Sequence, residues 1–255
     1  MKIDINSDMG EGYGPYRIGD DAALMQIVSS ANIACGFHAG DPIIMDRTIR
    51  LAKDKGVGIG AHPGLPDLLG FGRRIIQMDG HEIEKHMVYQ IGALQALATN
   101  AGYRVTHVSF HAAMGSMVNA DPDMADTTAR AIAAIDRDLI VFGMQGTEMM
   151  RAAQAVGLRT LTLFLADRAY DENANLVSRQ LRNSVITSPE AVARRVSRFL
   201  DSGTVETING ASIKVDARSI LVHSDTPGSV ELAATVRRVV EQGGGEVVPA
   251  ATLLS

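Results

Sequence analysis

The sequence alternates short apolar or β-branched runs with longer stretches that have the 3.6-residue period of amphipathic helices. This alternation is typical of repeated βα units around a parallel sheet. We predict seven strands, and they lie at residues 3–8, 30–36, 57–62, 107–111, 139–143, 160–167 and 219–225. A length of 255 residues suits one α/β barrel. We therefore expect an α/β fold, a seven-stranded parallel βα barrel that forms one domain over residues 1–255.

Local signals mark several element boundaries. The clearest helix is expected after Asp79, a candidate N-cap, and should stop near Gly102. Pro189 and Pro227 suit the first turns of two further helices, with Ser188 and Thr226 as their caps. Residues 204–216 read as a hairpin inserted before the last strand, and Asn209-Gly210 is expected to form its type I′ turn.

Composition and charge exclude several classes of protein. The chain has 24 basic and 29 acidic residues, so its formal charge is −5, and it has no block of like charge. It lacks the basic patch of a nucleic-acid-binding protein, a polybasic membrane anchor and an apolar run of about 18 residues. A single cysteine, Cys35, cannot form an internal disulfide. We expect a cytoplasmic protein that binds neither nucleic acid nor membrane, and the sequence is compatible with a homo-oligomer.

Ionisable residues follow almost every predicted strand. In a parallel βα barrel the active site lies at the carboxyl ends of the strands. The strand-end residues that we assign to catalysis are Asp8, His38, His62, His111, Asp167, His223 and Asp225. Such a set can supply general acids and bases near neutral pH, or nitrogen and oxygen ligands for a divalent metal. If a metal is present, we expect its ligands among Asp8, His38, His62 and Asp225, whereas His107, at a strand start, is expected to be structural.

Two glycine-rich loops are candidates for anion binding. Residues 10–14 follow the first strand, and residues 69–74 follow the third and include two arginines. Glycines let backbone amides approach an anion, and arginine adds bidentate donors, although neither loop has the P-loop pattern. For the first loop a flexible turn is the simpler interpretation. The residues that we assign to substrate or phosphate binding are Glu11, Asn32, Arg73, Arg74 and Arg168.

Two other features do not predict a site. His81 and His86 resemble a zincin signature, but a spacing of five places them about 140° apart around a helix. Cys35 is expected to be a small core residue rather than a nucleophile.

Several segments together resemble the LamB/YcsF family, whose members act as the A component of 5-oxoprolinase. The segments that carry the resemblance are residues 4–14 (DINSDMGEGYG), 30–42 (SANIACGFHAGDP), 60–74 (GAHPGLPDLLGFGRR), 89–94 (YQIGAL), 166–170 (ADRAY) and 222–227 (VHSDTP). The resemblance runs from the first strand to the last helix. It implies a distorted TIM-like barrel related to the glycoside hydrolase/deacetylase superfamily.

The same resemblance implies an activity. It implies ATP-dependent opening of the 5-oxoproline lactam to L-glutamate, with ATP and Mg²⁺ as cofactors and subunits B and C as partners. It also implies that the strand-end residues form the site. Whether ATP binds this protein or a partner is left open.

The chain departs from the family pattern within its fourth strand. The family usually reads HVKPHGALYN, whereas residues 107–116 read HVSFHAAMGS, so Ser109 replaces a lysine. Two alternatives therefore stay open. One is metal-dependent hydrolysis of another lactam, an amide or an N-acyl carbohydrate, and the other is a substrate-binding paralogue without turnover.

Overall fold

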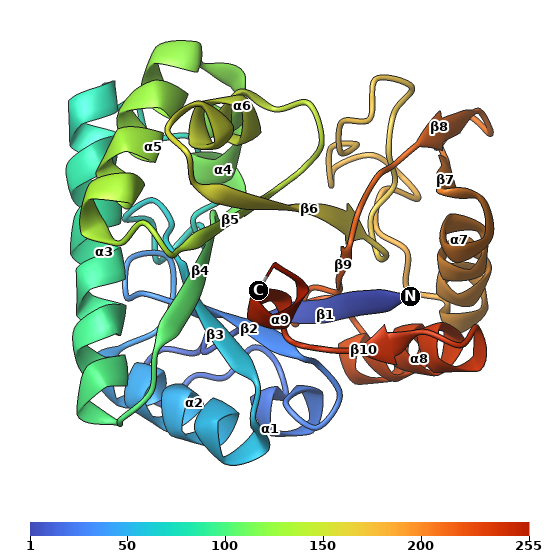
Figure 1. Cartoon of the computed structure of the whole chain (residues 1–255), viewed down its shortest axis with the longest axis horizontal. Coiled ribbons are helices and arrows are strands. Elements are labelled where there is room, and N and C mark those ends of the chain that lie inside the picture. The colour runs from blue at the N-terminus through green and yellow to red at the C-terminus, as the bar shows by residue number, and fades with distance from the viewer. Residues whose placement is uncertain (255) are drawn as a thin grey trace.

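The computed structural model describes residues 1–254, and a closed parallel barrel forms the centre of the molecule (Figure 1). Strand β1 pairs with β2 on one side and with β9 on the other, and β6 also pairs with β9, which closes the ring. Its strands are β1 (Lys2–Met9), β2 (Ser30–Ala34), β3 (Gly58–His62), β4 (Val105–Ser109), β5 (Ile140–Gly143), β6 (Arg159–Leu165) and β9 (Ser219–Leu221). The predicted seven-stranded parallel barrel is confirmed.

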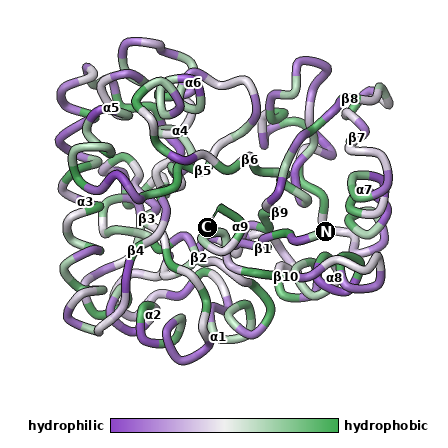
Figure 2. Tube along the Cα trace, viewed as in Figure 1, coloured by the Kyte–Doolittle hydropathy of each residue, from purple (hydrophilic) through white to green (hydrophobic). Residues whose placement is uncertain are grey.

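The described helices pack around the barrel, except for the last one, which lies across one of its openings. They are α1 (Asp21–Leu24), α2 (Pro42–Lys55), α3 (Gly80–Asn100), α4 (Ala112–Ala120), α5 (Pro122–Ile135), α6 (Glu148–Ala155), α7 (Pro189–Ser202), α8 (Ser229–Gln242) and α9 (Ala250–Leu253). Figure 2 shows hydrophilic and hydrophobic residues alternating along the outer helices, as expected for elements that pack one side on the barrel. Among the described residues, no helix combines the length and the apolar character needed to cross a membrane.

The predicted helix starts were right in two cases out of three. Asp79 caps α3 in a capping box with Glu82, and Ser188 caps α7 ahead of Pro189. The prediction for Thr226 was wrong. Helix α8 begins only at Ser229, after Gly228 in the left-handed region, because the Thr226 hydroxyl donates to Asp167 instead of capping a helix.

The predicted hairpin lies outside the barrel and consists of β7 (Thr204–Glu206) and β8 (Ser212–Lys214). Its predicted type I′ turn was wrong. Gly210 has a φ of +83°, but Asn209 does not have a positive φ. The Gly210 amide donates to the carbonyl of Thr207, and the Thr207 amide donates to the carbonyl of Ala211. One left-handed glycine is therefore enough for this longer loop.

The two ends of the barrel differ. At the amino ends of the strands, β10 (Glu246–Val247) pairs with β1, and α9 lies across the opening, near the centre of the view in Figure 1. At the carboxyl ends lie the longer connections, including residues 166–188 between β6 and α7. These connections carry most of the side chains considered below.

Candidate functional site

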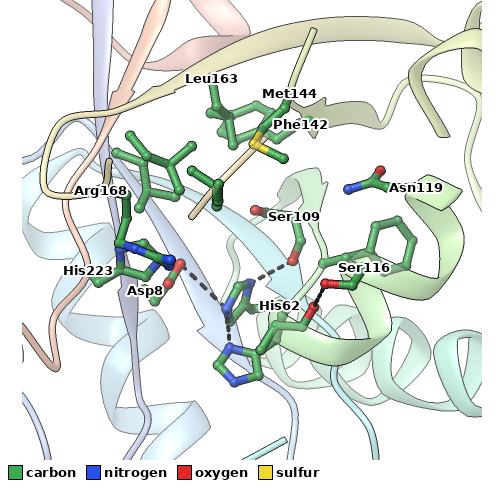
Figure 3. A pocket seen from close by; sticks show the side chains of 18 of the residues that line it. Asp8, His62, Ser109, Ser116, Asn119, Phe142, Met144, Leu163, Arg168 and His223 are labelled. Atoms are coloured by element: carbon green, nitrogen blue, oxygen red, sulfur yellow. Dashed lines mark hydrogen bonds and ion pairs between the residues drawn. The ribbon is translucent and has the colours of Figure 1, made fainter. Parts of the chain in front are cut away.

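Strand-end side chains converge on a cavity of about 300 Å³ at the mouth of the barrel (Figure 3). Of the residues that we predicted for the site, those that line the cavity are Asp8, His62, Arg73, His111, Arg168 and His223. Side chains from β5 and β6, among them Phe142 and Leu163, form an apolar wall. Polar groups set against an apolar wall are typical of small-molecule sites.

A buried cluster of three histidines and one carboxyl group adjoins the cavity, and two of its histidines belong to the lining. Its members are Glu11, His38, His62 and His111, and one ligand atom from each lies within 4.8 Å of the others. Glu11 Oε1 is 3.2 Å from His38 Nε2 and 3.5 Å from His111 Nδ1. The His38 and His111 rings are stacked, with their centroids 3.8 Å apart. The cluster joins residues that are distant in the sequence.

Backbone contacts define how two of these rings are oriented. His62 Nδ1 lies 2.6 Å from the carbonyl of Ser109, and His111 Nε2 lies 2.8 Å from the carbonyl of Phe71. Since a carbonyl only accepts, both of these nitrogens must be donors. When both rings are neutral, the other two nitrogens, His62 Nε2 and His111 Nδ1, carry lone pairs and face each other at 3.0 Å. Two facing lone pairs repel, so a shared proton or a cation is needed between these nitrogens. Metal-binding histidines commonly have such a carbonyl behind the distal ring nitrogen.

Electrostatics favour the uncharged forms of these groups. Burial, together with the neighbouring His62, lowers the pKa of both His38 and His111 well below the usual value of 6.5. Burial also lowers the pKa of His62, although the charge of Asp8 opposes it. Burial and the charges of Asp8 and Asp225 raise the pKa of Glu11 well above 4.5.

These residues fit a divalent metal ion. Neutral imidazole nitrogens and one carboxylate form a donor set suited to zinc or a similar cation. The set overlaps our predicted metal ligands in His38 and His62. It adds Glu11, which we had assigned to substrate or phosphate binding, and His111. Asp8 lies 3.5 Å from His62 Nε2, at the edge of the cluster, and Asp225 is engaged elsewhere.

His223 has the opposite electrostatic environment. Both Asp167 oxygens lie 3.0 Å from His223 Nδ1, and Asp167 also accepts from the Thr226 hydroxyl. Burial favours the neutral form of His223, but the charge and hydrogen bond of Asp167 outweigh it and raise the pKa of His223 above 6.5. The structure thus brings together the predicted Asp167 and His223 as a carboxylate–imidazole pair.

The predicted arginines do not all reach the cavity. Arg73 pairs with Asp225 at 2.5 Å, and Arg168 is nearly buried in the cavity wall. Arg74 instead pairs with Asp67, and its side chain is 65% exposed. The structure does not bring Arg74 into the site.

Asn32 lies behind the site rather than in it. Its amide donates to Asp8 Oδ1 at 2.9 Å and to Asn6 Oδ1 at 2.8 Å, and its own oxygen lies 3.0 Å from His107 Nε2. His107 is fully buried, and burial lowers its pKa to about 3. Asn32 therefore orients Asp8, and His107 holds Asn32 in place from the interior of the barrel. This agrees with the structural role predicted for His107.

In the two glycine-rich loops several backbone amides already have partners within the chain, so the anion-binding role of these loops stays a prediction. In the first loop, the amides of Gly10 and Gly14 donate to Asp21 and Asp41. In the second, the amide of Gly70 donates to Asp67. Carboxylates of the chain already occupy amides that an anion would need.

Two negative predictions agree with the structure. Cys35 is buried in the hydrophobic core, and burial raises the pKa of its thiol to about 12. His81 is 73% exposed in the first turn of α3, away from the lining of the cavity.

Sequence reasoning missed several residues that line the cavity. Arg179, in the long connection after β6, and Ser116 and Asn119, on α4, all contribute to its surface. None of them follows a strand directly, so the strand-end rule could not find them. The clustering of arginines in residues 168–182 was the only signal for Arg179.

Comparisons with known proteins agree with this architecture. The family model described as "LamB/YcsF family" matches residues 3–255. A relative from Bradyrhizobium diazoefficiens, named as a 5-oxoprolinase A component, is 79% identical over the full length of both chains. The crystal structure of a lactam utilization protein from Thermus thermophilus has a TM-score of 0.92 at 40% identity, with 97% of this chain and 99% of that chain covered. A structure described as "T48 deacetylase with substrate" shares only the fold, with a TM-score of 0.52 at 12% identity over 99% of this chain and 91% of that chain. The chain belongs to the LamB/YcsF family.

Proposed function

We propose that this protein is the A component of an ATP-dependent 5-oxoprolinase that opens the lactam of 5-oxoproline to L-glutamate together with subunits B and C. The family membership and the name of the 79% identical relative support this assignment. We further propose that the protein acts in the cytoplasm.

The observation that carries the chemistry is a pair of histidines on one cavity with pKa values shifted in opposite directions. His62 favours the neutral form and can accept a proton, whereas His223, held by Asp167, favours the protonated form and can donate one. Pairs with divergent pKa values are characteristic of acid–base catalysis. Opening a lactam requires both functions, because water must lose a proton and the ring nitrogen must gain one.

Asp8 is the third group of the proposed site. It lies between these histidines on the cavity wall and is held by Asn32 (Figure 3). Its carboxylate can orient the attacking water and stabilise the imidazolium that His62 becomes.

We place the ATP site on a partner protein of the complex. ATP and Mg²⁺ need a phosphate cradle, and the two loops that could provide one have amides that already donate to aspartates. This engagement of the loop amides supports an ATP site elsewhere in the complex.

The test is the hydrolysis of 5-oxoproline by the reconstituted complex, with and without ATP and each of its proteins. We expect His62→Gln and His223→Gln each to reduce kcat by about 10²- to 10⁴-fold, the usual contribution of a positioned acid or base. The matched control is His81→Gln, at an exposed histidine, and it should leave kcat unchanged. Full activity of both variants would refute the site, and binding without turnover in the complete complex would favour a non-catalytic paralogue.

A second candidate is metal-dependent hydrolysis of an amide or N-acyl bond without ATP. The cluster of Glu11, His38, His62 and His111 favours it, because a divalent cation there would supply Lewis-acid chemistry beside the cavity. Metal analysis of the purified chain distinguishes the two. A stoichiometric ion whose removal abolishes ATP-independent turnover would support the second candidate over the first.

A further inference from the structure

The cavity has two chemically different ends (Figure 3). Arg168, His223 and the carboxylate of Asp8 lie at one end, and Ser116 and Asn119, which are uncharged, lie at the other. The apolar wall formed by β5 and β6 lies between them. A ligand that fills this cavity therefore meets cations at one end only.

Positive charge at the first end exceeds what the chain itself neutralises. Arg168 is only 6% exposed, and its Nε and Nη2 donate to the carbonyls of Ser184 and Val177, which are neutral. Within residues 1–254, no carboxylate oxygen lies within 4.0 Å of the Arg168 guanidinium. A buried cation with no carboxylate in ion-pair contact is costly, so this end is suited to an anion.

Two more guanidiniums add to this charge. Arg73 and Arg179 both line the cavity, and they share one carboxylate, that of Asp225, at 2.5 and 3.8 Å. Burial and the charges of Arg179 and Arg73 lower the pKa of Arg168 to about 10, and the charge of Asp167 offsets this only in part. Arg179 is only partly engaged by Asp225, at 3.8 Å, and its side chain is 26% exposed.

We propose that Arg168 and Arg179 bind the carboxylate of an acidic lactam, whose ring lies along the apolar wall with its amide within reach of His62 and His223. This inference rests on the proposed function, since it takes the substrate to be a lactam. It adds the residues that recognise the carboxylate of that lactam and assigns specificity to Arg179. Planar guanidinium groups suit a carboxylate because they can donate two parallel hydrogen bonds.

The first test measures binding to the full-length chain by titration calorimetry, with 5-oxoproline and with 2-pyrrolidinone, the same lactam ring without the carboxylate. We expect 2-pyrrolidinone to bind roughly 10- to 100-fold more weakly, the range of a charge-assisted contact. Arg179→Gln should weaken the binding of 5-oxoproline by a similar factor and leave the affinity for 2-pyrrolidinone unchanged. Arg182→Gln is the matched control, because this arginine is exposed, lies three residues further along the same connection and does not line the cavity.

Inorganic phosphate at constant ionic strength distinguishes a carboxylate site from a phosphate site. Phosphate should not compete with 5-oxoproline, and competition that is lost in Arg179→Gln would overturn the assignment. Equal binding of the two lactams would also overturn it. Arg179 is the residue of choice because Arg168 also supports the fold through its carbonyl contacts.

The second test separates this inference from the proposed function. In the complex with subunits B and C, Arg179→Gln should raise KM for 5-oxoproline roughly 10- to 100-fold. Turnover with an unchanged KM in this variant would refute the carboxylate site and leave the proposed function intact. Arg179-dependent binding of 5-oxoproline without turnover in the complete complex would support the carboxylate site and refute the proposed function.

Discussion

At the scale of single residues, His223 depends on Asp167 for its charge. We expect Asp167→Asn to move the pKa of His223 from above 6.5 to below it, because burial and the charge of Arg179 lower it and only the charge of Asp8 then opposes them. Titration of the imidazole ring by NMR measures this shift, with exposed His81 as an internal reference. An unchanged His223 titration in the variant would show that Asp167 does not hold the proton.

The same pair has a consequence for stability. A raised histidine pKa stabilises the fold fully below pH 6.5, the usual value, and this contribution is lost as the pH rises through the folded-state pKa of His223. In Asp167→Asn this pH-dependent contribution should disappear. Urea unfolding at several pH values between about 5 and 9 would reveal the difference.

Much of the candidate site could be predicted because it lies at strand ends. Asp8, His62 and His223 follow from strand periodicity and the barrel rule alone. The stacking of His38 on His111 could not be predicted, because it depends on the path of the loop that carries Phe71 and Gly72. Arg179 was missed for the same reason, since its position depends on the fold of a long connection.

At the scale of elements, β3 and β4 are packed so closely that one glycine is required between them. A Cβ on Gly60 would lie 2.1 Å from Cδ2 of His107, whose ring stacks on Phe142 and bonds to Asn32. We expect Gly60→Ala to cost about 1–3 kcal/mol of unfolding free energy, the usual effect of overpacking. Chemical denaturation would measure it.

Gly92 provides the control for this substitution. It is exposed on α3, and nothing lies within 4 Å of its added Cβ. Gly92→Ala should therefore stabilise the protein by up to about 1 kcal/mol, because alanine is a better helix former. Equal free energies of unfolding for the two variants would show that the close packing of β3 on His107 does not limit the side chain at position 60.

Element boundaries were predictable where a local signal acts alone. Asp79 and Ser188 cap helices because their side chains bond only to neighbours in the first turn of the same helix. Thr226 has the same local signal, but the buried Asp167 takes its hydroxyl, and the helix starts later. A tertiary hydrogen bond therefore prevents N-capping when it engages the side chain that would form the cap.

At the scale of the whole molecule, the two ends of the barrel have different roles: one carries the candidate site, and the other holds the C-terminal segment against the strands. The candidate site lies at the carboxyl ends of the strands, and the C-terminal segment covers the amino ends (Figure 1). The amide of Ala250 donates to the Ser30 hydroxyl of β2, and the carbonyls of Leu253 and Leu254 accept from Arg218 and Arg159. The C-terminal segment thus connects strands from different parts of the barrel.

This division predicts that a change at the amino end affects stability without affecting the site. Leu253 is 8% exposed and belongs to the core, so Leu253→Ala should lower the free energy of unfolding by about 2–4 kcal/mol. The matched control is Leu181→Ala, since Leu181 is 59% exposed and a surface change should stay within about 0.5 kcal/mol. Below its unfolding transition, Leu253→Ala should bind 5-oxoproline with the affinity of the unaltered protein. A large loss of affinity in the folded variant would show that the two ends are coupled through the barrel.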